Sequence, residues 1–433
     1  MNEKMKPEIC RLAGVSTIAL VMMTSQGPAR AEDAATAPWE LFRAMKSGQC
    51  EPARAQLQTS SQAGDASARV YVGLAYLLGV CESKDEKRGV QLVRDAADSG
   101  LALAQDMLAH MYATGTGVEK NLASAFKWRL KAAEQGHADA QYSVGLMFKK
   151  GEGVAMDLRQ AAEWYRKAAE QGLASAQNDL GVTYSSGEGV TRDAGQAVEW
   201  YRKAAEQGLA VAQCNLAYKY SVGDGIAKNE KLAAEWYRKA AEQGDAVAQF
   251  NLGLRYSSGQ GLTKDFGQAA EWYRKAAEQG YVDAQVNLGR LYDRGDGVAK
   301  DARQAVEWYR KAAEQGDALA ANNLGTMYES GRGVLQDYAQ ALRYYTIAAR
   351  AGNAWGQRNL ARLLIDGLGT PVNVVQAHAW LNLAGAADRP HPDAVVERDE
   401  LAKRMTPAQL AEAQRLARTW QPGQLLGVKA GKS

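Results

Sequence analysis

One segment of ten residues recurs along the chain at a constant interval, and this period restricts the possible folds more than any other feature. The sequence Glu-Trp-Tyr-Arg-Lys-Ala-Ala-Glu-Gln-Gly begins at Glu163, Glu199, Glu235, Glu271 and Glu307, always 36 residues apart. Other columns keep the same step, so nine units cover residues 65–388. A period of this length predicts a solenoid, in which each unit packs only against its neighbours.

Each unit has the pattern of two helices, which we call helix A and helix B. In one unit, helix B places Ala161, Trp164, Tyr165 and Ala168 on a single face. Residues suited to capping, such as Asp157, precede helix B, and a glycine follows it. Helix A follows that glycine at once, and a Gly-x-Gly loop joins helix A to helix B. The pattern therefore predicts an all-α chain of helical hairpins.

The composition agrees with a repeated unit. The chain of 433 residues has 43 Gly and 10 Trp but only 9 Pro and 5 Phe. Most of the glycines lie at loops and helix ends of the units, and the Trp residues recur in one helix B column, which we interpret as core between helices. The formal net charge is only +3. Without a basic stripe, a nucleic-acid partner is not expected.

The N-terminus has the pattern of an export signal. Lys4, Lys6 and Arg11 precede an apolar run over residues 12–23, and small residues follow up to an Ala-x-Ala motif ending at Ala31. The run is shorter than the ~20 apolar residues that span a bilayer. We therefore predict a signal peptide over residues 1–31, cleavage after Ala31, a periplasmic or secreted protein, and no membrane span.

The segments that flank the nine units have patterns of their own. Residues 32–64 contain a shortened unit and predict an N-terminal capping hairpin. Residues 389–420 predict C-terminal capping helices, the last of which begins at Thr406 with the Gln409 of a capping box. Residues 421–433 are expected to form a flexible tail.

Two cysteines occupy equivalent places near the N-terminus. Cys50 and Cys81 each follow a Gly-x pair at the turn between the helices of adjacent hairpins. A disulfide requires Cα atoms within ~7 Å, whereas packed helices lie ~8–10 Å apart. The sequence leaves two possibilities open: a disulfide that fastens the N-terminal cap, or two free thiols.

The unit resembles the Sel1-like repeat, a relative of the tetratricopeptide repeat with a longer loop between its helices. The resemblance rests on the pattern A-x-A-Q-x-x-L-G-x-x-Y-x-x-G-x-G-V, followed by D-x-x-Q-A-x-x-W-Y-R-K-A-A-E-Q-G, over residues 65–388. It implies a right-handed α/α superhelical solenoid of tetratricopeptide-like hairpins that acts as an adaptor or scaffold. Exported bacterial members include regulators of sensor kinases, inhibitors of cell-wall enzymes and factors for host interaction.

Residues that could carry catalysis are sparse. The four histidines form no metal-binding motif, so neither a metal nor a cofactor is expected. Ser124 and Lys127 match the S-x-x-K motif of β-lactam-processing enzymes, but no S-D-N or K-T-G accompanies them. We therefore expect a non-enzymatic protein. The alternative is a β-lactam- or peptidoglycan-related enzyme, or an inhibitor of a cell-wall enzyme.

Three columns of helix A vary freely from unit to unit, and we call them the variable face. They contain Leu103, Asp106 and His110 with their equivalents at 36-residue steps, and steps of three and four place them on one side of the helix. We predict that this face lines a concave groove and binds a protein or peptide partner in the cell envelope, either as a scaffold or as a regulator. The candidate anchors are Tyr142, Leu146, Tyr218, Phe250, Leu254, Arg290, Trp355 and Arg358. An idle solvated face would vary in the same way.

Overall fold

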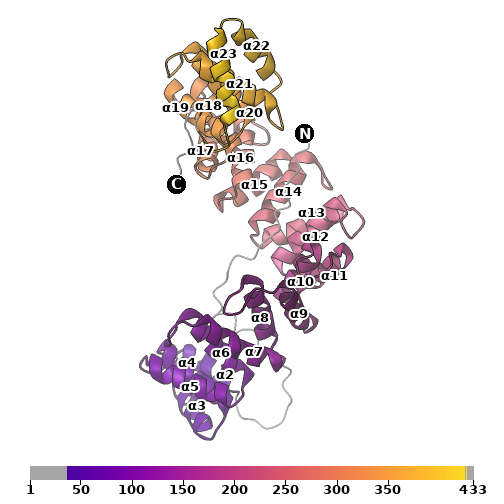
Figure 1. The fold of residues 1–433 in the computed structure, drawn as a ribbon. Helices are drawn as coiled ribbons and strands as arrows, with labels where there is room; N and C mark the ends of the chain where they lie inside the picture. The colour runs from indigo at the N-terminus through magenta and orange to yellow at the C-terminus, as the bar shows by residue number, and fades with distance from the viewer. Residues whose placement is uncertain (1–36, 425, 427–433) are drawn as a thin grey trace. The chain divides into compact units, whose positions relative to one another are not determined.

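The computed structural model describes residues 37–424 and residue 426. This part of the chain contains 22 helices and no strand, which confirms the predicted all-α architecture of repeated hairpins. Contacts divide the chain into two compact units: unit 1 extends to Asn229 and unit 2 begins at Glu230. In Figure 1, unit 1 includes the helices coloured indigo and purple, and unit 2 includes those coloured orange and yellow.

The helices are nearly uniform in length, and most have 13 residues. Unit 1 contains α2 (Pro38–Lys46), α3 (Ala53–Gln62), α4 (Ala66–Leu78), α5 (Glu86–Asp98), α6 (Ala102–Thr114), α7 (Leu122–Glu134), α8 (Ala138–Lys150), α9 (Leu158–Glu170), α10 (Ala174–Ser186), α11 (Ala194–Glu206) and α12 (Ala210–Val222). Unit 2 contains α13 (Glu230–Glu242), α14 (Ala246–Ser258), α15 (Phe266–Glu278), α16 (Val282–Arg294), α17 (Ala302–Glu314), α18 (Ala318–Ser330), α19 (Tyr338–Arg350), α20 (Ala354–Asp366), α21 (Val374–Ala386), α22 (Ala394–Ala402) and α23 (Pro407–Thr419).

Local chemistry fixes where these helices begin and end. The Asp157 carboxylate caps α9, because it accepts hydrogen bonds from the backbone N–H groups of Arg159 (2.9 Å) and Gln160 (3.0 Å). Helix α10 ends at Gly187, whose φ of 79° belongs to the left-handed region. The equivalent caps recur in other hairpins, so the same short sequence signals bound the helices throughout the array.

Buried glutamines connect most of the repeated hairpins to the preceding one. Gln141 of α8 donates from Nε2 to the carbonyl of Ala133 at the end of α7, 3.1 Å away. Its Oε1 accepts from Nε2 of Gln171, which follows α9, at 2.7 Å. The arrangement satisfies both ends of a buried amide, as burial requires. Equivalent bonds join Gln177 to Gln207, Gln249 to Gln279 and Gln285 to Gln315.

The aromatic residues of helix B form the core between helices, as the Trp and Tyr columns predict. Tyr165 is 1% exposed and Trp164 is 7% exposed. The Lys167 ammonium lies over the Trp164 ring, 3.8 Å from its centroid, and makes a cation–π contact. The helix A glycine allows a close approach here, because a Cβ on Gly145 would lie 2.6 Å from the Tyr165 ring.

The N-terminal hairpin of α2 and α3 is fastened to the first repeat by a disulfide. Cys50 and Cys81 are bonded, with their Cα atoms 5.4 Å apart. Cys81 occupies the place of the second loop glycine of later repeats and is the one described non-glycine residue with positive φ (56°). In later repeats that glycine contacts the backbone of the preceding repeat, as Gly153 contacts Leu122. The disulfide therefore joins two hairpins at the place where later repeats make backbone contact.

The C-terminal segment packs against the last repeat further than the sequence suggests. Thr406 and Gln409 form the expected capping box of α23, and the Trp420 ring meets the Trp380 ring at 5.8 Å. Beyond α23, the Gly423 carbonyl accepts two hydrogen bonds from the Arg350 guanidinium. Leu426 is 7% exposed within the core cluster. The sequence predicts a flexible tail from residue 421; in the structure residues 421–423 are exposed, the Gly423 carbonyl is bonded to Arg350, and Leu426 is buried.

Two expectations fall on parts of the chain outside the described residues. They are the signal peptide over residues 1–31 with cleavage after Ala31, and the end of the tail over residues 427–433. Within residues 37–424 and 426, no helix has the length and apolar character needed to cross a membrane.

Candidate functional site

The candidate anchors lie on helices A of both units. Unit 1 carries Tyr142 and Leu146 on α8 and Tyr218 on α12. Unit 2 carries Phe250 and Leu254 on α14, Arg290 on α16, and Trp355 and Arg358 on α20. The residues therefore form two sets, one in each unit.

The two outer columns of the variable face reach solvent at most positions. Leu146, Tyr218 and Leu254 are half-buried, and Arg290 is exposed. Trp355 is 51% exposed, which is uncommon for a residue with so large an apolar side chain. These side chains are accessible to a partner without any rearrangement of the helices.

The middle column of the variable face is mostly buried, although the sequence predicts that all three columns line a concave groove. Six of its members are buried: Asp106, Asn178, Cys214, Phe250, Val286 and Asn322. Neighbouring helices A cover this column, as the hydrogen bonds between Asn178 and Asn215 and between Asn322 and Asn359 show, both at 3.0 Å. The column varies in sequence because each member is matched to its own neighbour.

Phe250 is a candidate anchor that lies in this buried column. It is 7% exposed, and its ring centroid lies 4.9 Å from that of Tyr281 and 5.8 Å from that of Tyr273. These contacts place Phe250 in the core of unit 2, so a partner cannot reach it directly in this structure. We therefore assign Phe250 to packing.

Arg358 and Trp355 contact the C-terminal segment. The Arg358 guanidinium pairs with the Glu397 carboxylate of α22, and its Nε lies 3.0 Å from each carboxylate oxygen. Trp355 packs edge-on against His391, with ring centroids 4.1 Å apart. Burial and the nearby charge of Arg358 lower the pKa of His391, which is 2% exposed. Arg358 therefore connects α20 to α22, whereas the Trp355 ring remains partly exposed to solvent.

Sequence reasoning missed a fourth column that also lies on this side of the helices. Its members are Met107, Ser143, Asp179, Asn215, Asn251, Asn287, Asn323 and Asn359. Asp179 accepts a hydrogen bond from the Tyr142 hydroxyl at 2.9 Å, and Asn215 donates to Asn178. The run of five asparagines at 36-residue steps, preceded by one aspartate, was the available signal in the sequence.

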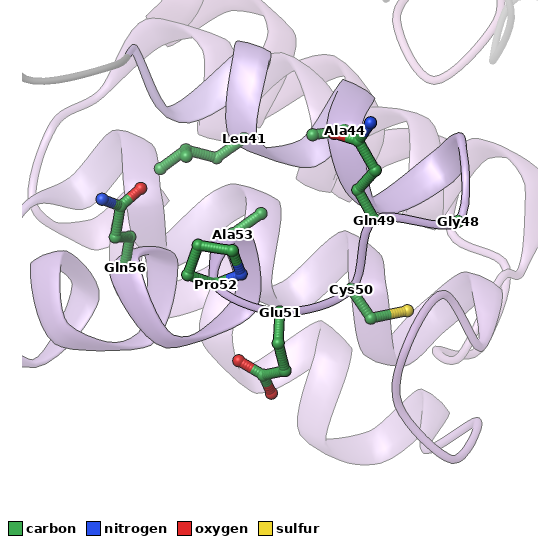
Figure 2. A pocket seen from close by; sticks show the side chains of 9 residues that line it. All are labelled: Leu41, Ala44, Gly48, Gln49, Cys50, Glu51, Pro52, Ala53 and Gln56. Carbon is green, nitrogen blue, oxygen red and sulfur yellow. The ribbon is translucent and has the colours of Figure 1, made fainter.

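A hollow of about 530 Å³ lies at the turn between α2 and α3, away from the variable face. Figure 2 shows the residues that line it, among them Leu41, Pro52 and Gln56. Its charged lining residue, Glu51, pairs with Arg54 at 2.8 Å. The hollow therefore presents no unpaired charge that would orient a ligand.

The S-x-x-K residues occupy ordinary positions on α7. The backbone N–H of Ser124 donates to the capping side chain of Asn121 at 2.9 Å, and Lys127 is exposed. In the described part of the chain, no three His, Cys, Asp or Glu side chains gather in a way that could hold a metal ion.

The repeat and its fold match known proteins. The Sel1 repeat model matches nine segments: residues 66–101, 102–137, 138–173, 174–209, 210–245, 246–281, 282–317, 318–353 and 356–388. A protective antigen of uropathogenic Escherichia coli strains, which displays an SLR fold, is 33% identical, with a TM-score of 0.61 over 91% of this chain and 96% of that chain. A Sel1 repeat protein from Oxalobacter formigenes is 34% identical, with a TM-score of 0.58 over 80% of this chain and 99% of that chain. Comparison with curated proteins gives no significant match.

Proposed function

The chain belongs to the Sel1 repeat family, and from this premise we propose that it is a non-catalytic scaffold or regulator in the bacterial cell envelope. Sel1 repeat proteins typically act as scaffolds for protein–protein interaction. In this proposal, a protein or peptide partner binds along the accessible outer columns of the variable face and reaches Tyr142, the half-buried member of the middle column in unit 1. Tyr142, Leu146 and Tyr218 would contact it in unit 1, and Leu254, Arg290 and Trp355 in unit 2.

The observation that carries the proposal is the contrast between columns of the same helices. Leu108, Leu180 and Leu252 repeat one residue type and are fully buried. On the same helices the outer column changes from His110 to Val182 to Leu254, and all three reach solvent. Aromatic and arginine side chains are the usual energetic centres of protein interfaces, and this face supplies both.

The location in the envelope rests on the N-terminal sequence and on the exported members that the family includes. A basic segment, an apolar run and an Ala-x-Ala motif together make a substrate for export and cleavage. N-terminal sequencing of the mature protein tests this, and we expect it to begin at Glu32. A mature chain that retains Met1 in the cytoplasm would overturn the assignment.

Partner capture tests the binding role. The full-length tagged protein is crosslinked in the producing bacterium, purified, and compared with Leu254→Ala and Arg290→Ala. We expect both variants to lose captured partner while their circular dichroism spectra remain unchanged. Glu278→Gln, an exposed change on helix B of the same unit, is the matched control.

Two results would contradict the proposal. Capture that is equal in both variants and in the control would show that the variable face is not the binding surface. Hydrolysis of nitrocefin that Ser124→Ala abolishes would instead support the enzymatic alternative.

A further inference from the structure

One carboxylate of unit 1 has hydrogen-bond donors around it but forms no ion pair with a cation of the described residues. Asp179 of α10 accepts from the Tyr142 hydroxyl at 2.9 Å and from the Asn178 amide at 3.0 Å. The cation that acts on it, Lys149, forms an ion pair with Glu188 at 3.5 Å. Asp179 is half-buried.

The repeat itself shows that this charge is not needed for folding. The equivalent residue is asparagine in five other repeats: Asn215, Asn251, Asn287, Asn323 and Asn359. Burial raises the pKa of the Asp179 carboxyl, although the bonds from Tyr142 and Asn178 and the charge of Lys149 oppose the rise. A neutral amide would avoid the cost of desolvating a charge, so the carboxylate has no structural advantage here.

Two tyrosines of unit 1, Tyr142 and Tyr165, lie near Asp179. The ring centroids of Tyr142 and Tyr165 lie 5.7 Å apart, and the Tyr142 hydroxyl donates a hydrogen bond to the Asp179 carboxylate. Tyr165 is 1% exposed, and its buried hydroxyl has no hydrogen-bond partner among the described residues. In another repeat, the equivalent hydroxyl of Tyr273 is bonded to Ser257 at 3.1 Å. Burial raises the pKa of both phenols, and the charge of Asp179 adds to the rise.

We propose that Asp179, with Tyr142 beside it, is the recognition point for a lysine or arginine side chain of the protein or peptide partner. The ammonium or guanidinium group would pair with the carboxylate and lie against the Tyr142 ring. This inference rests on the proposed function, because it gives the partner a chemistry: a basic side chain in an otherwise apolar segment.

The surrounding face supports that chemistry. Leu146, Val182 and Tyr218 are half-buried neighbours on α8, α10 and α12 and offer apolar surface. The accessible columns of unit 2 instead carry two exposed arginines, Arg290 and Arg362. A basic segment would therefore prefer unit 1, since like charges disfavour it on unit 2.

Asp179→Asn is a clean test, because it installs the residue that five other repeats carry. The probe is a fluorescein-labelled nonapeptide of alternating leucine and lysine, with a leucine–glutamine peptide as its neutral counterpart. Fluorescence anisotropy with the full chain should show binding of the lysine peptide. Asp179→Asn should weaken that binding at least about tenfold, as expected when one partner of a desolvated charge pair is removed.

Glu170→Gln is the control, because it removes the same charge from the exposed side of helix B in unit 1. Lysine-peptide affinity in this variant should stay at the wild-type value. Equal affinity of wild type and Asp179→Asn overturns the inference, as does equal binding of the lysine and glutamine peptides. Either of these results could occur while Leu254→Ala and Arg290→Ala still abolish partner capture. In that case the inference about Asp179 is wrong and the proposed function stands.

Discussion

The second glycine of each Gly-x-Gly loop should be far less replaceable than the first, and unit 1 offers a matched pair. Gly187 and Gly189 both have positive φ, 79° and 76°. A Cβ on Gly189 would lie 2.1 Å from the carbonyl oxygen of Leu158, in the preceding repeat. A Cβ on Gly187 would lie 3.2 Å from its nearest neighbour, the Cβ of Arg192. The two positions thus share the backbone strain and differ in what surrounds them.

The difference in free energy of unfolding follows from these distances. An L-residue in the left-handed region costs about 1–2 kcal/mol, and both alanine variants incur that cost. At Gly189 the new methyl would also approach a backbone oxygen more than about 1 Å closer than the ~3.3 Å of a C–H···O contact. Separating the two repeats to relieve this overlap adds about 1–3 kcal/mol. We expect losses of about 1–2 kcal/mol for Gly187→Ala and about 2–5 kcal/mol for Gly189→Ala.

Hydrogen exchange is the suitable assay, because long repeat arrays do not unfold in a single cooperative step. Amides at the start of α9 should exchange faster in Gly189→Ala than in Gly187→Ala, and urea unfolding followed by circular dichroism should begin earlier. Gly172→Ala is a second control, since φ is 93° there and nothing lies within 4 Å of the added Cβ. Equal effects of Gly189→Ala and Gly172→Ala would refute the argument that contact between repeats requires this glycine.

Three further predictions concern other parts of the chain. Cys50→Ser with Cys81→Ser should destabilise the N-terminal hairpin by about 3–4 kcal/mol, the loop-entropy value for a separation of 31 residues. Faster hydrogen exchange confined to α2–α4 would support it, and unchanged exchange there would contradict it. Phe250→Ala should cost about 3–5 kcal/mol because it empties a core site, whereas a surface role predicts no shift in the urea midpoint. Asp179→Asn should be more stable than wild type at neutral pH. The pKa of Asp179 is raised in the folded protein. The stability of the wild type therefore falls as pH rises above the ordinary carboxyl pKa of about 4. The advantage should vanish below that pH in thermal melts, and an advantage that does not depend on pH would contradict this reasoning.

The variable face shows how far internal comparison of the repeats could lead. Variation pointed to Leu254, Arg290 and Trp355, which reach solvent in the structure. It pointed equally to the columns of Phe250 and Asn178, which are buried, because a residue that packs against its own neighbour can vary as freely as one in water. It also missed Asp179, since this residue lies beside a run of five asparagines in a column that the variable face does not include. Only the hydrogen bond from Tyr142 gives that single difference a chemical meaning.

The sequence by itself determined the hairpin, its length, its caps and the number of repeats, because these depend on contacts within one unit and between adjacent units. The Asp157 cap, the glycine helix ends and the Tyr165 core are local features that a 36-residue period repeats. The tertiary structure alone decided which helix A residues reach solvent and that Cys50 bonds to Cys81. Burial of a side chain depends on where the next helix lies, and a change of a few ångströms in that distance leaves the sequence period unchanged.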